Sequence, residues 1–157
     1  MEERFDRLGE LPLIVQALEE HPNFTQFSGK ELEVFAGYCI DKTVKKGEQL
    51  FSEGETGSAM FIVKKGSIKI LKEGFLGETV LTQINPGEFL GEMAVIDGSP
   101  RSAAAKAAVD SELLEIKQES FEKMKKEHPE TAIKIMDLLL KLLSYRLRIT
   151  TLKMLKK

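Results

Sequence analysis

Residues 87–105 form the stretch of this sequence that decides the fold, and they read Gly-Glu-Phe-Leu-Gly-Glu-Met-Ala-Val-Ile-Asp-Gly-Ser-Pro-Arg-Ser-Ala-Ala-Ala. Glycine at two points lets the backbone come close to a ligand. Residues 91–94 predict the start of a short helix, whose unpaired N–H groups attract an anion. Arg101 adds a forked cation that matches two phosphate oxygens, and Ser102 adds a hydroxyl beside it. The stretch therefore indicates a loop that binds a small anion.

The remaining side chains of this stretch suit the rest of such a ligand. Glu92 supplies two acceptor oxygens, which suit the hydroxyl of a sugar. Ala103, Ala104 and Ala105 are small and leave room for a molecule to lie against the next strand. The alternative is that Glu92 and Arg101 form an ordinary surface ion pair, which would contribute little.

Short extended segments bounded by glycines fill the middle of the chain. One begins after Gly57, and another, Ser67–Lys72, alternates polar and apolar residues as a half-buried strand does. Closely spaced short strands indicate an antiparallel sandwich or barrel. The expected segments are Thr43–Lys46, Gln49–Phe51, Ala59–Val63, Ser67–Lys72, Glu78–Ile84, Ser102–Ala108 and Glu112–Ile116.

Helical patterns lie at both ends of the chain. Apolar residues at helical spacing predict a helix from about Leu8 to Glu20, which His21-Pro22 ends because a residue before proline avoids the α region. Ser28 and Glu31 form a capping-box pattern for a second helix. After the strands, Lys117–Lys126 predicts a short helix, and Pro129 opens a long one that runs to the end of the chain.

The complete 87–105 pattern resembles the phosphate-binding cassette of the cyclic nucleotide-binding domain family, which includes the catabolite activator protein and the regulatory subunits of cAMP-dependent protein kinase. We call residues 87–105 the cassette. The shared pattern is Gly-Glu, apolar or small residues, a short turn, Pro-Arg, then a hydroxyl residue or Ala and a further Ala, and every position is filled here. The resemblance implies a mainly β fold with flanking helices (α+β): an eight-stranded antiparallel β-roll, jelly-roll-like, with N-terminal helices and a long C-terminal helix.

The resemblance also implies a role for each cassette side chain. Arg101 would bind the phosphate, Glu92 the ribose 2′-hydroxyl, and the amides near Met93 and Ala94 a phosphate oxygen. The counterpart of Ser102 contacts the phosphate too, and a hydroxyl there helps to accommodate guanine. The expected ligand is therefore cAMP, with cGMP left open. The ligand-binding residues expected in the cassette are Gly91, Glu92, Met93, Ala94, Arg101, Ser102 and Ala103.

The walls of the expected pocket are less well defined by the sequence. Phe89 and Leu90 are expected to be wall residues rather than recognition residues. The apolar side of the base pocket is expected to come from Val63, Ile70 or Leu71, and the sequence leaves open which of them faces inward.

The last helix carries two apolar stripes on nearly opposite faces. A helix that covers one core needs one stripe, so two stripes indicate two partners. We expect one stripe to pack on the β-roll and the other on a second copy, as a parallel pair. The alternative is a helix buried on both sides within one domain. The first stripe is Ile133, Met136, Leu140, Leu143, Leu147 and Met154, with Thr150 interrupting its heptad spacing; the second is Ile135, Leu138, Leu142, Tyr145, Ile149 and Leu152, flanked by Leu139.

The segment 146–151 carries a second resemblance. In the catabolite activator family, a similar Arg-Leu-x-apolar segment on the dimer helix precedes two hydroxyl residues that reach the adenine ring, one of them from the opposite subunit. Thr150 and Thr151 match that pair and complete the expected ligand-binding residues. This chain has about one extra helical turn between Pro129 and the segment, so two threonines without a specific role are the alternative.

Composition bounds the environment of the chain. Its 157 residues include 42% hydrophobic residues, enough for one domain over residues 1–157, which we divide into helices (1–40), β-roll (41–117) and C-terminal helices (118–157). The net charge of −2 gives no basic field for nucleic acid or an acidic membrane, and Arg146 and Arg148 near the basic end favour a complement to the helix dipole. Neither a signal peptide nor a membrane-spanning run is evident. With a single cysteine, Cys39, expected in the core, we predict a soluble, cytoplasmic protein.

The function favoured by these patterns is a sensor that transmits occupancy by a cyclic nucleotide through its last helix to a second copy, as a homodimer, or to an unidentified effector protein. The relatives' helix-turn-helix would begin near Lys157, so we expect no direct DNA binding by this chain; whether a longer parent protein exists is left open. The alternative is the same fold acting as a protein-interaction scaffold or as a sensor of a different small anionic ligand.

Catalytic patterns are missing from the sequence. Its two histidines, His21 and His128, each lie beside a proline and have no metal-ligand spacing. Cys39 has no nearby histidine to activate it. We therefore expect no enzymatic activity, no metal site and no cofactor.

Overall fold

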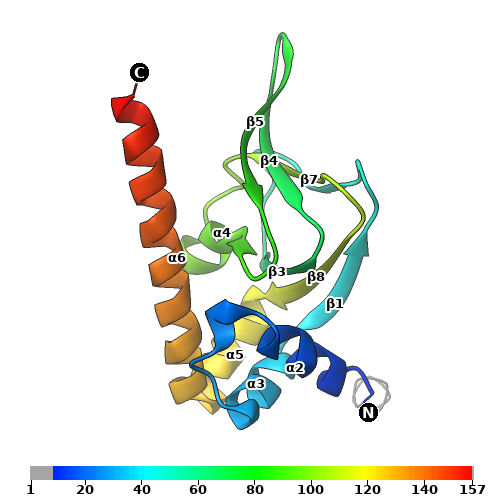
Figure 1. Ribbon diagram of the computed structural model, residues 1–157, viewed down its shortest axis with the longest axis vertical. Coiled ribbons are helices and arrows are strands. Elements are labelled where there is room, and N and C mark those ends of the chain that lie inside the picture. The colour runs from blue at the N-terminus through cyan, green and yellow to red at the C-terminus, as the bar shows by residue number, and fades with distance from the viewer. Residues whose placement is uncertain (1–8, 157) are drawn as a thin grey trace.

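Two four-stranded antiparallel sheets form the centre of the molecule (Figure 1). The computed structural model describes residues 9–156. One sheet has the order β1-β8-β3-β6 and the other the order β2-β7-β4-β5. This arrangement confirms the predicted eight-stranded β-roll. The strands are β1 (Ile40–Val44), β2 (Gln49–Phe51), β3 (Ala59–Lys65), β4 (Ile68–Gly74), β5 (Gly77–Ile84), β6 (Phe89–Leu90), β7 (Ala104–Ala107) and β8 (Ser111–Lys117).

Helices cover one end and one side of the roll (Figure 1). The N-terminal helices and the helix after β8 gather at one end, the cassette contains a short helix, and the last helix rises along the side. No helix in the described part of the chain is long and apolar enough to cross a membrane. The helices are α2 (Leu11–Glu19), η1 (Pro22–Phe24), α3 (Gly29–Ala36), α4 (Glu92–Asp97), α5 (Gln118–Glu127) and α6 (Pro129–Leu155).

Local signals in the sequence account for the ends of the N-terminal helices. α2 ends at Glu19, before His21-Pro22, as predicted, although Leu8 lies outside the described residues. The capping box of α3 is present: the Glu31 amide donates to Ser28 Oγ at 3.1 Å, and the Ser28 amide donates to Glu31 Oε1 at 3.0 Å. Each of these two bonds satisfies a backbone donor that the first helical turn cannot.

Two strands differ from the sequence-based expectation. β6 is a two-residue strand inside the cassette, where we expected only wall residues, and it pairs with β3 at Phe61–Leu90 and Ile62–Phe89. β1 begins at Ile40, three residues before the predicted extended segment, because Ile40 already lies opposite Glu115 of β8.

A β-bulge breaks the alternation of β4. The register against β5 shifts between Ile70 and Leu71. As a result Ile68 and Leu71, three residues apart, are both fully buried, whereas Ile70 stays partly exposed. The alternation predicted for Ser67–Lys72 therefore holds only up to the bulge.

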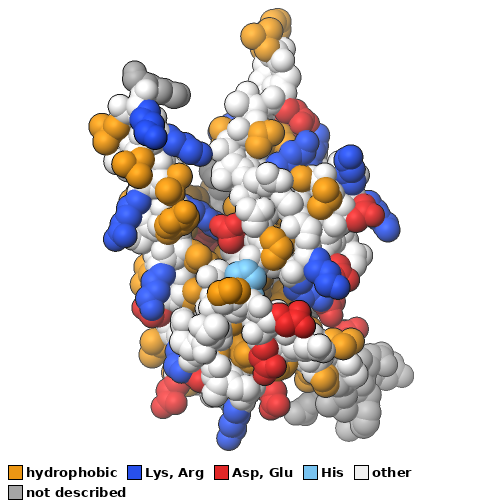
Figure 2. Space-filling model, viewed as in Figure 1, with side chains coloured by type: hydrophobic (Ala, Val, Ile, Leu, Met, Phe, Trp, Pro, Cys, Tyr) orange, Lys and Arg blue, Asp and Glu red, His pale blue; other side chains and the backbone are white. Residues whose placement is uncertain are grey.

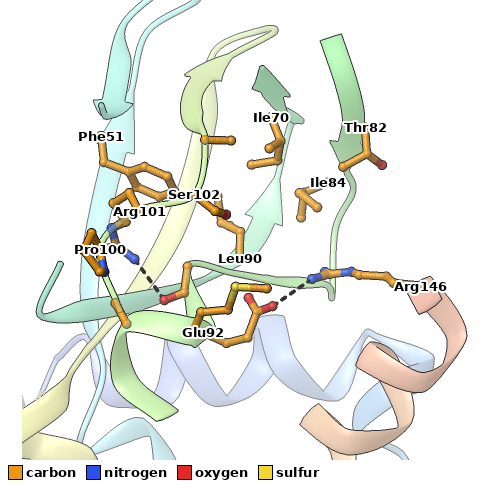
Figure 3. A pocket seen from close by; sticks show the side chains of 14 residues that line it. Phe51, Ile70, Thr82, Ile84, Leu90, Glu92, Pro100, Arg101, Ser102 and Arg146 are labelled. Atoms are coloured by element: carbon orange, nitrogen blue, oxygen red, sulfur yellow. Dashed lines mark hydrogen bonds and ion pairs between the residues drawn. The ribbon is translucent and has the colours of Figure 1, made fainter. Parts of the chain in front are cut away.

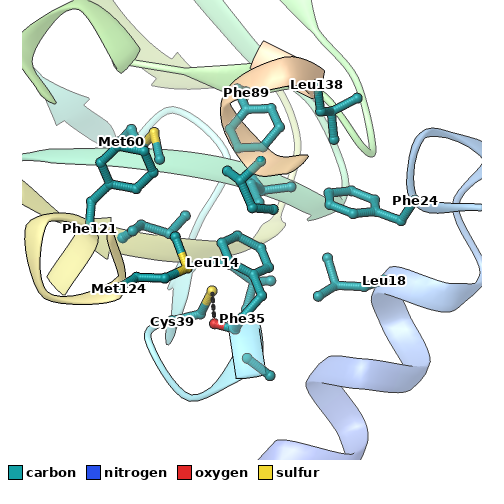
Figure 4. Packing of buried hydrophobic residues seen from close by; sticks show 14 of the residues in the cluster. Leu18, Phe24, Phe35, Cys39, Met60, Phe89, Leu114, Phe121, Met124 and Leu138 are labelled. Carbon is teal, nitrogen blue, oxygen red and sulfur yellow. Dashed lines mark hydrogen bonds between the residues drawn. The ribbon is translucent and has the colours of Figure 1, made fainter. Parts of the chain in front are cut away.

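The core consists of two hydrophobic clusters. The larger joins the helices to the outer face of the first sheet and contains Phe24, Phe35, Phe89 and Leu114 (Figure 4). Cys39 is fully buried in this cluster, as expected, and its thiol donates to the Phe35 carbonyl at 3.3 Å. The smaller cluster fills the interior of the roll.

The two stripes of α6 have different environments. Ile135 and Leu138 of the second stripe, with the flanking Leu139, are buried in the larger cluster, which also contains residues of α3, α5 and the first sheet. The helix thus packs mainly on α5 and α3, not on the β-roll alone as expected. Beyond Leu142 even this stripe is largely exposed, and this part of α6 rises beside the β-roll in Figure 1.

The first stripe lies open to solvent. Its members Ile133, Met136, Leu140, Leu147 and Met154 are all exposed, and apolar side chains gather along this helix in Figure 2. The alternative of a helix buried on both sides within one domain is therefore wrong. A second exposed apolar feature is the tip of the β4–β5 hairpin, Phe75 and Leu76.

Candidate ligand-binding site

The cassette turns from β6 directly into α4. Gly91 makes this turn with φ of +74°, a left-handed conformation that favours glycine. A Cβ at this position would also lie 2.5 Å from Nη1 of Arg101, so glycine provides the space for that guanidinium. The backbone at Gly91 thus approaches the Arg101 side chain, whereas the close approach to a ligand that the sequence predicts stays a prediction.

A cavity of about 210 Å³ lies between the cassette and the sheet that contains β4 and β5 (Figure 3). All seven ligand-binding residues expected in the cassette line it. Of the three candidates for the apolar wall, Ile70 lines the cavity, whereas Val63 and Leu71 belong to the buried core. The lining residues are Phe51, Ile70, Thr82, Ile84, Leu90, Gly91, Glu92, Met93, Ala94, Pro100, Arg101, Ser102, Ala103 and Arg146.

Arg101 is a buried cation held by neutral groups. Only 8% of the residue is exposed. Its Nη1 donates to the Gly91 carbonyl at 2.9 Å, its Nη2 donates to the Ala59 carbonyl at 2.7 Å, and its Cζ lies 4.2 Å from the centre of the Phe51 ring. Within the described residues Nε is buried without a hydrogen-bond partner. This side chain therefore keeps an unsatisfied donor and a charge with no carboxylate at ion-pair distance.

The electrostatics of Arg101 follow from this burial. Desolvation lowers the pKa of the guanidinium from its usual value, and the negative charges of Glu55 and Glu92 oppose that shift. No carboxylate among the described residues forms an ion pair with it at 4.0 Å or less. An anion that enters the cavity would supply the missing counter-charge.

Glu92 is also buried, with 6% of the residue exposed. Its Oε1 lies 3.6 Å from Nη1 of Arg146, a residue of α6 (Figure 3). The alternative of an ordinary surface ion pair between Glu92 and Arg101 is therefore wrong, because both residues are buried and each has different partners.

Arg146 is the main residue of the site that sequence reasoning missed. It donates to the Phe89 carbonyl and lies 3.9 Å from Glu88, in addition to its contact with Glu92. We expected this arginine to complement the dipole at the end of the helix, but α6 continues to Leu155, more than two turns further. The sequence contained a signal for this role, because Arg146 lies one turn before Thr150, a predicted ligand-binding residue, on the same helix face.

Thr150 and Thr151 lie apart from the cavity in a single chain. Their hydroxyls donate to the carbonyls of Arg146 at 3.0 Å and Leu147 at 2.9 Å, within the helix itself, and both residues are exposed. Neither lines the cavity. Their assignment to the base of a nucleotide stays a prediction.

Phe51, Thr82, Ile84 and Pro100 complete the lining; Pro100 belongs to the predicted cassette, but the other three were not predicted. Three of them come from strands or turns that only sheet pairing brings to the cassette, and their sequence neighbourhood carries no functional pattern. Thr82 adds a hydroxyl on β5, opposite Glu92 in Figure 3. In residues 9–156, no group of three or more His, Cys, Asp or Glu side chains is placed to hold a metal ion.

The chain belongs to the cyclic nucleotide-binding domain family, whose model matches residues 41–128. It is 31% identical over 101 residues to the cyclic AMP receptor protein of Thermus thermophilus, a match that covers 64% of this chain and 47% of that protein. It is 31% identical over 91 residues to a cAMP-dependent protein kinase regulatory subunit of Mycosarcoma maydis, over 58% of this chain and 17% of that protein. The chain thus spans less than half the length of these relatives.

The fold also matches a solved cyclic nucleotide-binding domain. A solved cyclic nucleotide-binding domain from Methylobacillus flagellatus superposes with a TM-score of 0.82 at 23% identity, covering 96% of this chain and 85% of that one. The family is regulatory and binds its ligand rather than transforming it, although proteins named as a lysophospholipase and a glutaminase also contain a matching segment.

Proposed function

We propose that this protein is a cAMP sensor whose ligand lies in the 210 Å³ cavity, with cGMP as the alternative cyclic nucleotide. The observation that carries the proposal is Arg101, a buried cation with an unpartnered Nε and no acidic partner among the described residues. A cyclic phosphodiester bears one negative charge, which suits one arginine. The relatives named for cyclic AMP favour that ligand.

The part of the cavity next to Glu92 suits the ribose of such a ligand. The carboxylate of Glu92 reaches the cavity from the first turn of α4, next to the amides of Met93 and Ala94. We assign the 2′-hydroxyl to Glu92 and a phosphate oxygen to these amides, as in the resemblance. The base would then lie toward Ile70, Ile84 and Thr82, on the apolar side of the cavity.

Occupancy would reach α6 through Glu92. This carboxylate contacts Arg146 of α6, so a ribose hydroxyl that engages Glu92 changes the partners of an α6 side chain. A ligand shifts a conformational equilibrium by its differential affinity for the two states, and this shared carboxylate provides such a difference. We propose that α6 is the element that transmits occupancy.

A homodimer through the first stripe of α6 is part of this proposal. The stripe fills the two seam positions of a heptad repeat, one at residues 133, 140, 147 and 154 and the other at residues 136, 143 and 150. In a parallel pair, Thr150 lies in the seam and Thr151 beside it, so one copy's hydroxyls would lie near the other copy's Arg146. This arrangement supports Thr150 and Thr151 as base contacts from a second copy.

The remaining features of the proposal concern setting and activity. We propose a cytoplasmic location, which fits a sequence whose single cysteine offers no disulfide framework. We also propose that the chain acts by binding and not by catalysis.

Isothermal titration of nucleotide-stripped protein with cAMP, cGMP and 5′-AMP tests the proposal. We expect a cyclic nucleotide to bind with a Kd of about 1 µM or tighter, equivalent to about −8 kcal/mol, and 5′-AMP not to bind, because its phosphate carries a second charge and no ring. The ratio of the cAMP and cGMP affinities decides the base preference.

The absence of heat with both cyclic nucleotides would contradict the proposal, provided that circular dichroism shows folded protein. The alternative of a scaffold or of a different small anionic ligand would then apply. Those two are separated by whether cyclic di-nucleotides or inorganic phosphate raise the thermal midpoint.

A further inference from the structure

Gly57 lies against the Arg101 guanidinium, in a loop outside the cassette. It lies between β2 and β3, and a Cβ built on it would be 2.4 Å from both Cζ and Nε of Arg101 and 2.8 Å from Nη2. No real Cβ occupies such a position, so the observed place of the guanidinium requires a residue without a side chain here.

Three other contacts hold the guanidinium against Gly57. The carbonyls of Gly91 and Ala59 each accept one hydrogen bond, and the Phe51 ring covers one face. Together they fix the position and the plane of the group before any ligand binds. A forked donor fixed in this way binds a phosphate without first losing side-chain freedom.

The backbone around Gly57 has little freedom to move away. The Arg101 amide donates to the Glu55 carbonyl at 2.9 Å, and the Gly54 amide donates to the Arg101 carbonyl at 2.8 Å. These two bonds hold the loop to the backbone of Arg101. A methyl group at position 57 would therefore displace the guanidinium and not the loop, and a shift away from residue 57 breaks the bond to Ala59.

We propose that Gly57 is a positioning residue for ligand binding: its bare backbone lets the Arg101 guanidinium rest on the Ala59 and Gly91 carbonyls, in the orientation that meets the anion of the ligand. This inference rests on the proposed function, since it assigns the phosphate to Arg101. It extends the site to a loop that lies outside the cassette.

Gly57→Ala tests the inference by titration with cAMP. We expect the affinity to fall about tenfold or more, because a displacement of about 1 Å at a fixed recognition group has an effect of this size. Gly29→Ala is the matched control: its Cβ meets nothing closer than 3.8 Å, and its affinity should be unchanged. Thermal unfolding followed by circular dichroism shows that each variant is folded.

A double-mutant cycle separates positioning from a general disturbance of the loop. In Arg101→Ala, the side chain lacks the Nε, Cζ and Nη2 atoms that the methyl group would meet. Gly57→Ala should therefore change cAMP affinity by less than about twofold in the Arg101→Ala background. An equal loss in both backgrounds would overturn the inference, as would an unchanged or increased affinity in Gly57→Ala alone.

A measurement without ligand tests the inference even if the protein binds no cyclic nucleotide. In ¹⁵N-labelled empty protein, the Nε–H signal of Arg101, assigned by its absence in Arg101→Lys, should exchange slowly with water, because this atom is buried. Gly57→Ala should accelerate the exchange about tenfold or more. Unchanged exchange would refute the positioning role, whereas failure of wild-type protein to bind any cyclic nucleotide would refute only the proposed function.

Discussion

Arg101 shows how a single residue prepares the site. Dehydrating a cation costs free energy, and here that cost is met when the chain folds and not when the ligand arrives. The carbonyls of Gly91 and Ala59 and the face of Phe51 reduce the cost without neutralising the charge. The empty site therefore retains its attraction for an anion.

Removing this cation provides the first prediction. Arg101→Ala should weaken cAMP binding by about 2–4 kcal/mol, which is about 30- to 1,000-fold in Kd, because the charge-assisted bonds to the phosphate are lost. Isothermal titration measures the change. Arg148→Ala, which removes an exposed arginine of α6, is the matched control and should bind as wild type. Equal affinities for Arg101→Ala and wild type would exclude Arg101 as the phosphate ligand.

Single residues also show how far the sequence specifies the site. Glu92 and Arg101 were predictable because they belong to one contiguous stretch whose spacing is informative. The choice between Ile70 and Leu71 was not, because it depends on a bulge that forms only against β5. Arg146 reaches Glu92 from a distant helix, and tertiary packing alone brings the two together.

At the scale of elements, an ion pair joins the N-terminal helices to α6. Lys134 Nζ lies 2.8 Å from Glu31 Oε2 and also donates to Glu31 Oε1 at 2.9 Å. The hydrogen bond from Lys134, followed by that from the Ser28 backbone, lowers the pKa of Glu31 from 4.5 to about 2. Because this pKa is lower in the folded than in the unfolded chain, the ionised carboxylate stabilises the fold at pH values above the unfolded pKa. This contribution is lost as the pH falls from about 4.5 to 2.

Glu31→Gln tests this link, because glutamine keeps the capping box and removes the charge. We expect a lower thermal midpoint than wild type at pH 7, and a difference that closes as the pH falls toward 2. Glu33→Gln on the same helix, an exposed residue, is the control and should follow wild type at every pH. A constant difference across this range would show that the charge of Glu31 does not stabilise the fold.

A second link joins the outer half of α6 to the cassette. Arg146 contacts Glu92, Glu88 and the Phe89 carbonyl. In Arg146→Ala, the amides of α6 after Leu142 should exchange with solvent about three- to tenfold faster, because local opening then breaks fewer contacts. Hydrogen exchange read by mass spectrometry measures this, with Arg148→Ala as the control. Equal protection in the two variants would contradict the link.

The elements themselves were largely specified by local chemistry. Ser28 with Glu31, Pro129 and the glycines around the strands mark ends that the structure confirms within one to three residues. β6 was missed because two residues carry no periodicity, and only its pairing with β3 makes it a strand. The packing of α6 on α5 and α3 was missed because apolar periodicity identifies a buried face but not the element that covers it.

At the scale of the whole molecule, the exposed stripe of α6 predicts the oligomeric state. Wild-type protein should sediment with twice the mass of one chain, and Leu147→Glu should sediment with the mass of one, because a charge in the seam is costly to bury. Leu13→Glu is the matched control: Leu13 of α2 is 65% exposed and Leu147 is 68% exposed, but Leu13 lies outside the stripe. A monomeric wild-type protein, or a dimeric Leu147→Glu, would refute the dimer.

The length of α6 has a mechanical consequence. Its 27 residues, at a rise of 1.5 Å each, make a rod of about 40 Å that is anchored in the core near Pro129 and held beyond Leu142 by the contacts of Arg146 with the cassette. A rotation of roughly 10° about the anchored end would carry the far end through about 7 Å. Such a rod works as a lever arm: a displacement at Arg146, about 26 Å from the anchored end, becomes about one and a half times larger at Leu155.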